Sequence, residues 1–377
     1  MTSGSGTSGS GTSGGTPLSG EQNPFLRYRE RLDSYAGVTS GDLTDDEFVD
    51  LVADLNERVR VVWGHGFAIS PLIDGSALAA ASDVKSSLSI KVEAGGVGGS
   101  HKARHLMGVA IERLVVERRG HADSTQRLAI ASCGNAALGA AVMARALDRE
   151  LDVFVPTWAD EVVVDQLHEL GATVNRCERR HGESGDPCYL RFQEATAGGG
   201  AAFSVQGTDT PTTFDGGQTL GWEIAEQTDH VDALYVQVGG GALATAVSRG
   251  LPAARIMPVQ AEGCAPLRRA WDRWVAAGQA AVSPEFMTPW QDPHSLATGI
   301  LDDITYDWMP LLQRTRETNG HPIVATETAI EQAYVLAHAH TDVHVCSTGT
   351  AGFAGLLTEP AEVAEHVVVL FTGIDRT

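Results

Sequence analysis

Lys102 is the residue whose surroundings in this sequence best suit covalent chemistry. It follows a glycine-rich run, residues 97–101, and precedes residues 106–114, which have the apolar spacing of a buried helix. At a helix start, free backbone N–H groups and the helix dipole disfavour an extra positive charge and so lower the pKa of a lysine. The neutral amine is the form that makes Schiff bases, so Lys102 is a candidate for carrying a cofactor. The alternative is a solvated surface lysine, which is the common case at helix starts.

A second glycine-rich turn, residues 239–243, follows a predicted buried strand at residues 233–238. Three consecutive glycines leave their amides unhindered at the start of the next predicted helix. Such amides form a cradle for a phosphate group. A turn made only for tight packing is the alternative.

The same turn also fits a dinucleotide-binding fingerprint. Gly239, Gly241 and Ala244 occupy its three small-residue positions, and Glu262 follows about 20 residues later at the end of the next predicted strand. A nicotinamide-dependent oxidoreductase is therefore a rival interpretation. That interpretation leaves Lys102 and Thr372 without a role.

Two further turns carry polar groups. Residues 132–135, Ser-Cys-Gly-Asn, lie between a predicted strand at 127–131 and a predicted helix at 136–147. Their amides, hydroxyl and carboxamide can hold a carboxylate and a phenolic oxygen, although an ordinary helix cap is the alternative. Thr372 follows a predicted buried strand at 367–371 and places a hydroxyl at another strand end.

The histidines beside the lysine do not predict a metal site. His101 and His105 are four residues apart, but no third ligand stands at a recognisable spacing. We therefore predict no bound metal.

The elements that must position these turns alternate between strand and helix. Further strands are predicted at 151–155, 172–177, 201–205 and 255–261, with a helix at 160–170. This alternation predicts an α/β fold with parallel sheets flanked by helices, and ligands at the carboxyl ends of the strands. The stretch from about 280 to 325, rich in Pro, Asp and Trp, is predicted to be the longest irregular segment and of a kind that lines sites.

Composition narrows the class of protein. The chain has 377 residues, a hydrophobic fraction of 43% and a formal charge of −21, which argues against nucleic acid or an anionic membrane as a partner. No apolar run reaches the roughly 18 residues of a membrane span. Five scattered cysteines without a C-x-x-C motif favour the reducing cytoplasm. Residues 1–20 are a Gly/Ser/Thr tract that we interpret as a disordered tail or linker, outside the fold.

Taken in chain order, these motifs resemble the fold type II pyridoxal-phosphate enzymes, the tryptophan synthase β superfamily. The resemblance covers roughly residues 60–377 and is nearest in character to threonine synthase and the serine/threonine dehydratases. It rests on these segments: Lys91-x-Glu93, Gly99-Ser100-His101-Lys102, Ser132-x-Gly134-Asn135, the region around Trp222-Glu223-Ile224, Val238-Gly239-Gly240-Gly241 and Thr372-Gly373, with Leu296-Ala297-Thr298 similar to the synthase.

The resemblance implies a role for each matching residue. Lys102 would form the Schiff base with pyridoxal 5'-phosphate, and Thr372 would bond the pyridine nitrogen. The cofactor phosphate would lie on Gly239, Gly240, Gly241, Ala242 and Leu243. Asn135 would contact the 3' oxygen, and the substrate carboxylate would lie on Ser132, Cys133, Gly134 and Asn135.

The implied reaction removes the Cα proton of an amino acid and then expels or replaces a β or γ substituent. A neutral hydroxyl at the pyridine nitrogen suits such elimination, because it does not stabilise a protonated ring. The implied fold has two three-layer sub-domains with the cofactor in the cleft between them. We expect a large domain from residues 21–104 and 206–377, a small inserted domain from 105–205, and a homodimer.

The sequence departs from the family pattern near the substrate side. Relatives commonly read Asn-Pro-Thr-Gly-Ser-Phe-Lys-Asp around the lysine and Glu-Pro where this chain has Cys346-Ser347. A histidine directly before the lysine, as His101 is here, resembles the pattern of the tryptophan synthase β chain. A non-catalytic member of the family is therefore a third interpretation, against which the retained lysine speaks.

Overall fold

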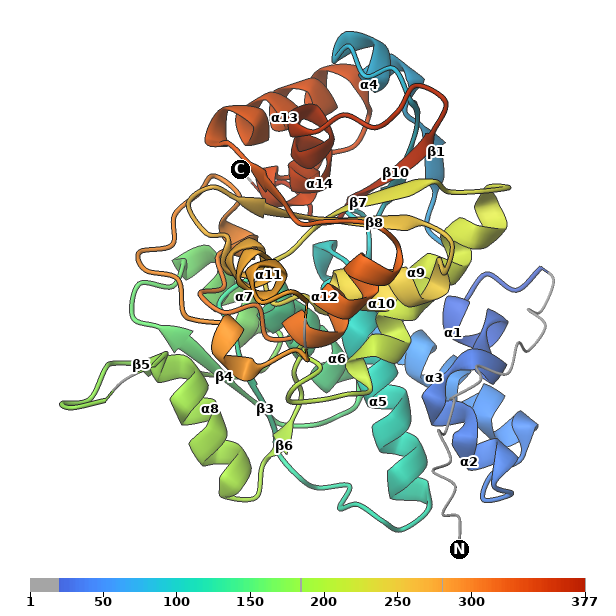
Figure 1. Cartoon of the computed structure of the whole chain (residues 1–377). Coiled ribbons are helices and arrows are strands. Elements are labelled where there is room, and N and C mark those ends of the chain that lie inside the picture. Colours follow the sequence, from blue (N-terminus) through green and yellow to red (C-terminus); the bar gives the residue numbers. More distant parts are fainter. Residues whose placement is uncertain (1–19, 184, 280, 377) are drawn as a thin grey trace, which may run out of the picture.

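The computed structural model describes residues 20–183, 185–279 and 281–376. Two sheets, each with helices on both faces, make up the chain (Figure 1). The predicted tail at residues 1–20 lies outside the described residues, except for Gly20. Of the helices that the structure describes, none is long and apolar enough to cross a lipid bilayer.

The larger sheet has six strands in the order β1-β2-β10-β7-β8-β9. All neighbouring strands in it are parallel except β1 and β2, which are antiparallel. Its last strand in the sequence, β10, lies in the interior between β2 and β7. The strands are β1 (Leu72–Asp74), β2 (Ser87–Val92), β7 (Ala233–Gln237), β8 (Arg255–Ala261), β9 (Ile323–Ala325) and β10 (His366–Phe371).

Alternating side chains of β10 enter two separate cores, as expected for a strand buried on both faces. Val367, Val369 and Phe371 belong to the core under α4, α13 and α14, whereas Val368 and Leu370 belong to the core under α9, α10, α11 and α12. These helices are α4 (Ser76–Ala81), α9 (Thr213–Gln227), α10 (Ala242–Gly250), α11 (Pro266–Ala276), α12 (Trp308–Glu317), α13 (Glu327–His340) and α14 (Ser347–Thr358).

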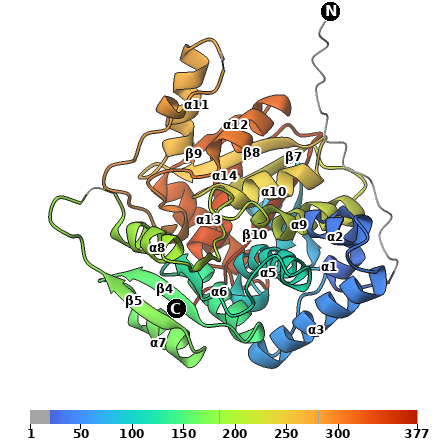
Figure 2. The same ribbon diagram turned by 90° about the horizontal axis from the view of Figure 1, so that it is seen from below.

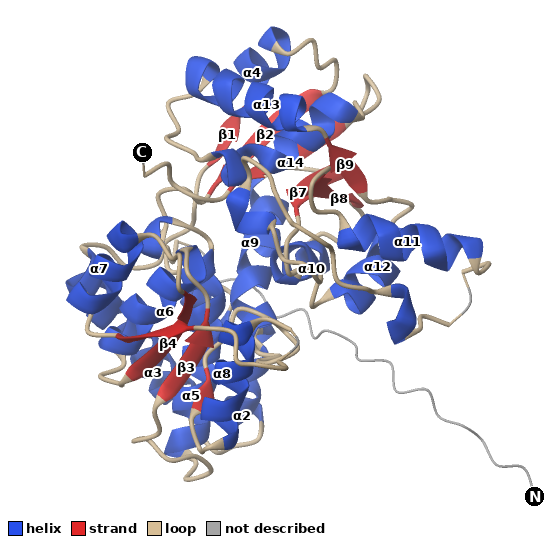
Figure 3. Ribbon diagram, turned by 90° about the vertical axis from the view of Figure 1, so that its left-hand side faces the viewer, coloured by secondary structure: helices blue, strands red, loops and turns tan. Residues whose placement is uncertain are grey.

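The smaller sheet is fully parallel, with four strands in the order β5-β4-β3-β6 (Figure 3). Side chains of α5, α6 and α7 cover one face, and α8 covers the other. Both sheets are therefore three-layer, which confirms the predicted fold class. The elements are β3 (Leu128–Ala131), β4 (Leu151–Pro156), β5 (Thr173–Cys177), β6 (Ala201–Ala202), α5 (Lys102–Arg118), α6 (Asn135–Ala146), α7 (Glu161–Glu169) and α8 (Pro187–Ala197).

Three N-terminal helices extend the core of the smaller sheet. Side chains of α1 (Pro24–Arg27) and α3 (Asp45–Trp63) share one hydrophobic cluster with α5 and α6, and α2 (Ala36–Thr39) lies beside them (Figure 2). A capping box between Thr44 and Glu47 fixes the start of α3. The division into 21–104 plus 206–377 and an inserted 105–205 remains a prediction.

Two predicted segments differ in the structure. The stretch at 280–325 is not irregular throughout, since it contains α12 and β9. Trp308, Leu311 and Leu312 have helical spacing and are buried, while Pro310 falls in the first turn, where its missing N–H costs no hydrogen bond. The strand expected at 201–205 is shorter, because only Ala201 and Ala202 pair with β3.

Candidate active site

The loop that delivers Lys102 leads from the end of β2 to the first residue of α5. Gly98 and Gly99 have φ values of 71° and 72°, in the left-handed region that favours glycine. A Cβ on Gly98 would lie 3.3 Å from the Cα of Gly139, so the loop packs closely on α6. The prediction that Lys102 stands at a helix start is confirmed.

Burial lowers the pKa of Lys102 below its usual value. The carboxylates of Asp302 and Asp307 act in the opposite direction. The chain has only two other lysines, Lys85 and Lys91. Lys85 is exposed, whereas Lys91 is fully buried and donates to Glu223 at 2.6 Å. Among the described residues, Lys102 is therefore the one lysine that is neither exposed nor held in an ion pair, and its charge interacts with those of Asp302 and Asp307.

The turn at 132–135 connects β3 to α6, and Asn135 is the first residue of that helix. The Oδ1 atom of Asn135 accepts a hydrogen bond from Nη1 of Arg376 at 2.5 Å. A Cβ on Gly373 would lie 3.2 Å from Nδ2 of Asn135, and Ser100 forms a β-bridge with Gly373. The three turns that contain Lys102, Asn135 and Thr372 therefore meet at one place.

The glycine turn at 239–241 joins β7 to α10. Gly241 has φ 98°, and no side chain among the described residues caps the helix that follows. Gly239 faces the carboxylate of Asp302, because a Cβ there would lie 2.4 Å from Oδ2. The N–H of Gly240 also interacts with this carboxylate. The turn thus already holds an anionic oxygen of the protein itself.

Thr372 follows the last residue of β10 and is 1% exposed. Its hydroxyl oxygen accepts from Nε2 of Gln237 at 2.6 Å, and its carbonyl accepts from the N–H of His101 at 3.2 Å. Both ring nitrogens of His101 are buried without a hydrogen-bond partner among the described residues. Burial lowers the pKa of His101, so the ring is neutral.

A buried ion network lies behind Lys102 and holds α5 in place. Arg104, two residues after Lys102, donates to Glu93 at 2.9 Å and to Glu223 of α9 at 2.5 Å. Lys91 of β2 also pairs with Glu223. These buried charges therefore hold α5 in place and do not line the site. They include the charged residues of the segments Lys91-x-Glu93 and Trp222-Glu223-Ile224.

Sequence reasoning missed three charged residues of the site: Asp302, Asp307 and Arg376. The two aspartates lie in the segment that we predict to line a site, and that prediction names no residue in it. Asp307 accepts from the N–H of Gly207 at 3.0 Å, and its own N–H donates to the carbonyl of Gly240. Burial raises the pKa values of Asp302 and Asp307 to about 6.

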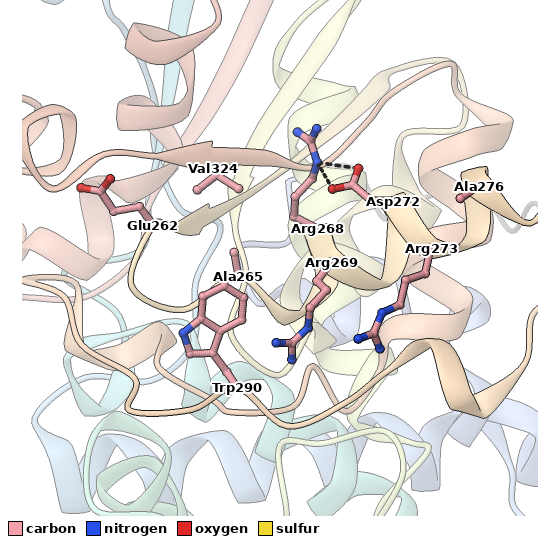
Figure 4. A pocket seen from close by; sticks show the side chains of 9 residues that line it. All are labelled: Glu262, Ala265, Arg268, Arg269, Asp272, Arg273, Ala276, Trp290 and Val324. Atoms are coloured by element: carbon pink, nitrogen blue, oxygen red, sulfur yellow. Dashed lines mark hydrogen bonds and ion pairs between the residues drawn. The ribbon is translucent and has the colours of Figure 1, made fainter.

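Glu262, the acidic residue of the dinucleotide interpretation, has a structural role. Its Oε1 atom accepts the N–H of Glu327, the first residue of α13, at 2.8 Å. It lines a surface groove beside α11, together with Arg268 and Trp290 (Figure 4). Among the described residues, no candidate cofactor ligand lines this groove.

Comparisons with known proteins identify the family of the chain. A family model described as "Pyridoxal-phosphate dependent enzyme" matches residues 65–373. The biosynthetic L-threonine dehydratase of Escherichia coli is 30% identical over 163 residues, 42% of this chain and 30% of that protein. Serine racemase of Bos taurus is 27% identical over 286 residues, 74% of this chain and 80% of the racemase.

Solved structures share the fold. Threonine deaminase from T.th. has a TM-score of 0.67 at 21% identity, covering 86% of this chain and 98% of that chain. The chain spans less than a third of the length of the E. coli dehydratase that it matches, with 30% covered.

Proposed function

Because the chain belongs to the family of pyridoxal-phosphate dependent enzymes, we propose that it is a lyase that eliminates a β substituent from a small α-amino acid, as serine and threonine dehydratases do. Its cofactor is pyridoxal 5'-phosphate. The observation that carries the proposal is the meeting of two turns: the one that leads to Lys102, a lysine of lowered pKa, bonds through its backbone to the one that contains the uncharged hydroxyl of Thr372. The names of the relatives, which include dehydratases and ammonia-lyases, support the same reaction class.

The residues at the strand ends fit this cofactor. The first turn of α10 has no capping side chain among the described residues, and the amide of Gly240 already interacts with a carboxylate. Amides in this arrangement bind anions, as a phosphate requires. Of the three lysines in the chain, Lys102 is the one that neither lies at the surface nor sits in the buried ion network.

Four groups would hold the cofactor. Lys102 would carry it, residues 239–243 would bind its phosphate, Asn135 its 3' oxygen and Thr372 its pyridine nitrogen. When bound, the cofactor supplies an electron sink that acidifies the Cα–H bond of the amino acid. Lys102 would receive the Cα proton on Nζ, because burial favours the neutral amine that can accept it.

The substrate carboxylate is assigned to the turn at 132–135. This turn offers backbone N–H groups and the Ser132 hydroxyl at the start of α6, where the helix dipole favours an anion. Arg376 adds a guanidinium group beside Asn135. The carboxylate would thus be oriented with Cα toward Lys102.

Three finer features remain proposals. Replacement of the β or γ substituent, as in threonine synthase, is supported by the motif Leu296-Ala297-Thr298. A homodimer rests on the family resemblance. A cytoplasmic location is supported by the five cysteines, all of which are free.

Borohydride reduction of the holoenzyme, followed by peptide mapping, tests the proposal. We expect the reduced cofactor on Lys102 and none in Lys102→Ala. Labelling should be unchanged in Lys85→Ala, because Lys85 is exposed and pairs with Asp83. Serine, threonine, O-phosphohomoserine and O-acetylserine are then added one at a time, and 2-oxo acid release is measured. A protein that pyridoxal phosphate cannot reconstitute, or that is labelled elsewhere than Lys102, would contradict the proposal.

A further inference from the structure

A buried amide stands directly behind the Thr372 hydroxyl. Gln237 is the last residue of β7, immediately before the residues that lead into the glycine turn, and is 4% exposed. Its Nε2 atom lies 2.6 Å from Oγ1 of Thr372, 3.1 Å from the carbonyl oxygen of Gly349 and 3.4 Å from that of Leu370. This amide therefore connects β7 with α14 and with β10.

The surroundings fix which end of the amide faces Thr372. The backbone oxygens of Gly349 and Leu370 can only accept hydrogen bonds, so the amide NH2 must point at them. A flipped amide would bring Oε1 against two carbonyl oxygens and would lose both bonds. An amide NH2 has two hydrogens, and its nitrogen does not accept. The two shortest contacts, 2.6 Å to Thr372 and 3.1 Å to Gly349, take these hydrogens, so the NH2 group is the donor to Thr372. The contact of 3.4 Å to the Leu370 carbonyl can only share one of them.

The direction of this bond decides what the hydroxyl can do. A threonine hydroxyl has one hydrogen and two lone pairs, and Gln237 uses one lone pair. The hydrogen of Thr372 has no acceptor among the described residues, and it therefore remains available to a group that enters the site. A buried hydroxyl in this state favours an acceptor over a second donor, because a second donor would leave the hydroxyl hydrogen unsatisfied.

We propose that Gln237 is a positioning residue that sets the Thr372 hydroxyl as a hydrogen-bond donor and so keeps the pyridine nitrogen of the bound cofactor unprotonated. An unprotonated pyridine nitrogen is an acceptor for the hydroxyl hydrogen, whereas a protonated one is a donor that would take the second lone pair and leave that hydrogen unsatisfied. The proposal rests on the proposed function, since it needs the cofactor ring at Thr372. It adds a residue that would never touch the cofactor.

The test is the nitrogen-15 chemical shift of holoenzyme loaded with pyridine-15N-labelled pyridoxal phosphate, recorded as a function of pH. In the wild type we expect the shift of an unprotonated pyridine at neutral pH. Gln237→Met keeps the side-chain volume but frees the hydroxyl hydrogen to turn toward a backbone carbonyl. We expect the pH at which the ring nitrogen is half protonated to rise by about one unit, the equivalent of one net hydrogen bond.

Matched variants separate positioning from general damage. Thr372→Ser keeps the hydroxyl and should keep the wild-type shift. Gln260 is a comparable buried amide on the adjacent strand β8, and its Nε2 donates to the carbonyl of Val238 and the hydroxyl of Thr305. Gln260→Met should also leave the shift unchanged. If Gln237→Met does not fold, Gln237→Leu provides the second variant, because it also removes the amide donor without adding a charge.

The outcomes distinguish a failure of the proposed function from a failure of the role proposed for Gln237. A wild type that does not bind the labelled cofactor contradicts the proposed function. A wild type with a protonated ring at neutral pH, or Gln237 variants with an unaltered shift, overturns the role of Gln237 and leaves the proposed function standing. A shift that moves equally in Gln260→Met also overturns it.

Discussion

Asp302 occupies part of the anion cradle that the cofactor phosphate is proposed to use, and its charge should weaken phosphate binding. A Cβ on Gly239 would lie 2.4 Å from Oδ2 of Asp302, and the N–H of Gly240 interacts with the same carboxylate. A phosphate on these amides must displace Asp302 or tolerate its charge. Replacing Asp302 with Asn removes the charge and nearly preserves the shape of the side chain.

The size of the effect follows from the distance and the pKa. Two unit charges about 4 Å apart repel by about 4 kcal/mol at an effective dielectric constant of 20. Asp302 can move partly away, and solvent screens the remaining repulsion. We therefore expect Asp302→Asn to bind the phosphate ligand more tightly by about 1.4–3 kcal/mol, or roughly ten- to hundredfold in affinity, at pH 8. Burial raises the pKa of Asp302 to about 6, so at pH 5 the wild-type side chain is mostly neutral and the gain should nearly vanish.

Calorimetric titration with pyridoxine 5'-phosphate measures this effect without Schiff-base formation, because the ligand has no aldehyde. Wild type, Asp302→Asn and Asp303→Asn are compared at pH 8 and pH 5. Asp303 is the matched control: it is the adjacent carboxylate, its pKa is also raised by burial, and its side chain is not among the described groups that meet the glycine turn. An unchanged or weaker affinity in Asp302→Asn at pH 8, or a gain of equal size at both pH values, would refute the reasoning.

Four further substitutions, one of them a control, test the support of the site by urea unfolding. Glu223→Gln removes one of two anions from a buried ion network and should cost about 3–5 kcal/mol, because it leaves the buried Lys91 without a carboxylate partner. Gly216→Ala should prevent folding, since its Cβ would lie 1.9 Å from the carbonyl oxygen of Arg104, whereas Gly134→Ala, with nothing within 4 Å, should unfold like the wild type. Burial raises the pKa of Asp215 to about 7, so the folded state keeps a proton that the unfolded state loses near pH 4. This group alone should lower the stability by up to about 1.4 kcal/mol per unit as the pH rises from 4 to 7, and the slope of Asp215→Asn should be less steep than that of the wild type by this amount.

Local patterns in the sequence were enough to predict the strand–turn–helix units. The turn at 132–135, the turn at 239–241 and Thr372 each follow a predicted strand of mostly apolar residues. The strand before Lys102, β2, alternates polar and apolar residues and is not among the predicted strands. Parallel strands bring their carboxyl ends to the same edge, so these turns could be expected to meet. The fold class could be predicted for the same reason.

Contacts between distant segments could not be predicted in this way. Asp302 and Asp307 reach the glycine turn from the loop just before α12, in a segment that looks irregular in the sequence. Arg376 reaches Asn135 across 241 positions of sequence, and no local pattern records such a contact. The packing of α3 on α6 likewise depends on which apolar faces meet, a choice that periodicity leaves open.

The interior place of β10 also sets the order in which the ribosome can complete this site. The four strands of the smaller sheet are all made by residue 202, so that sheet can close early. β2 and β7, in contrast, wait with unpaired edges until residues 366–371 emerge from the exit tunnel and fill the gap between them. The site that combines Lys102, the glycine turn and Thr372 therefore cannot be completed before the last strand of the sheet has been synthesised.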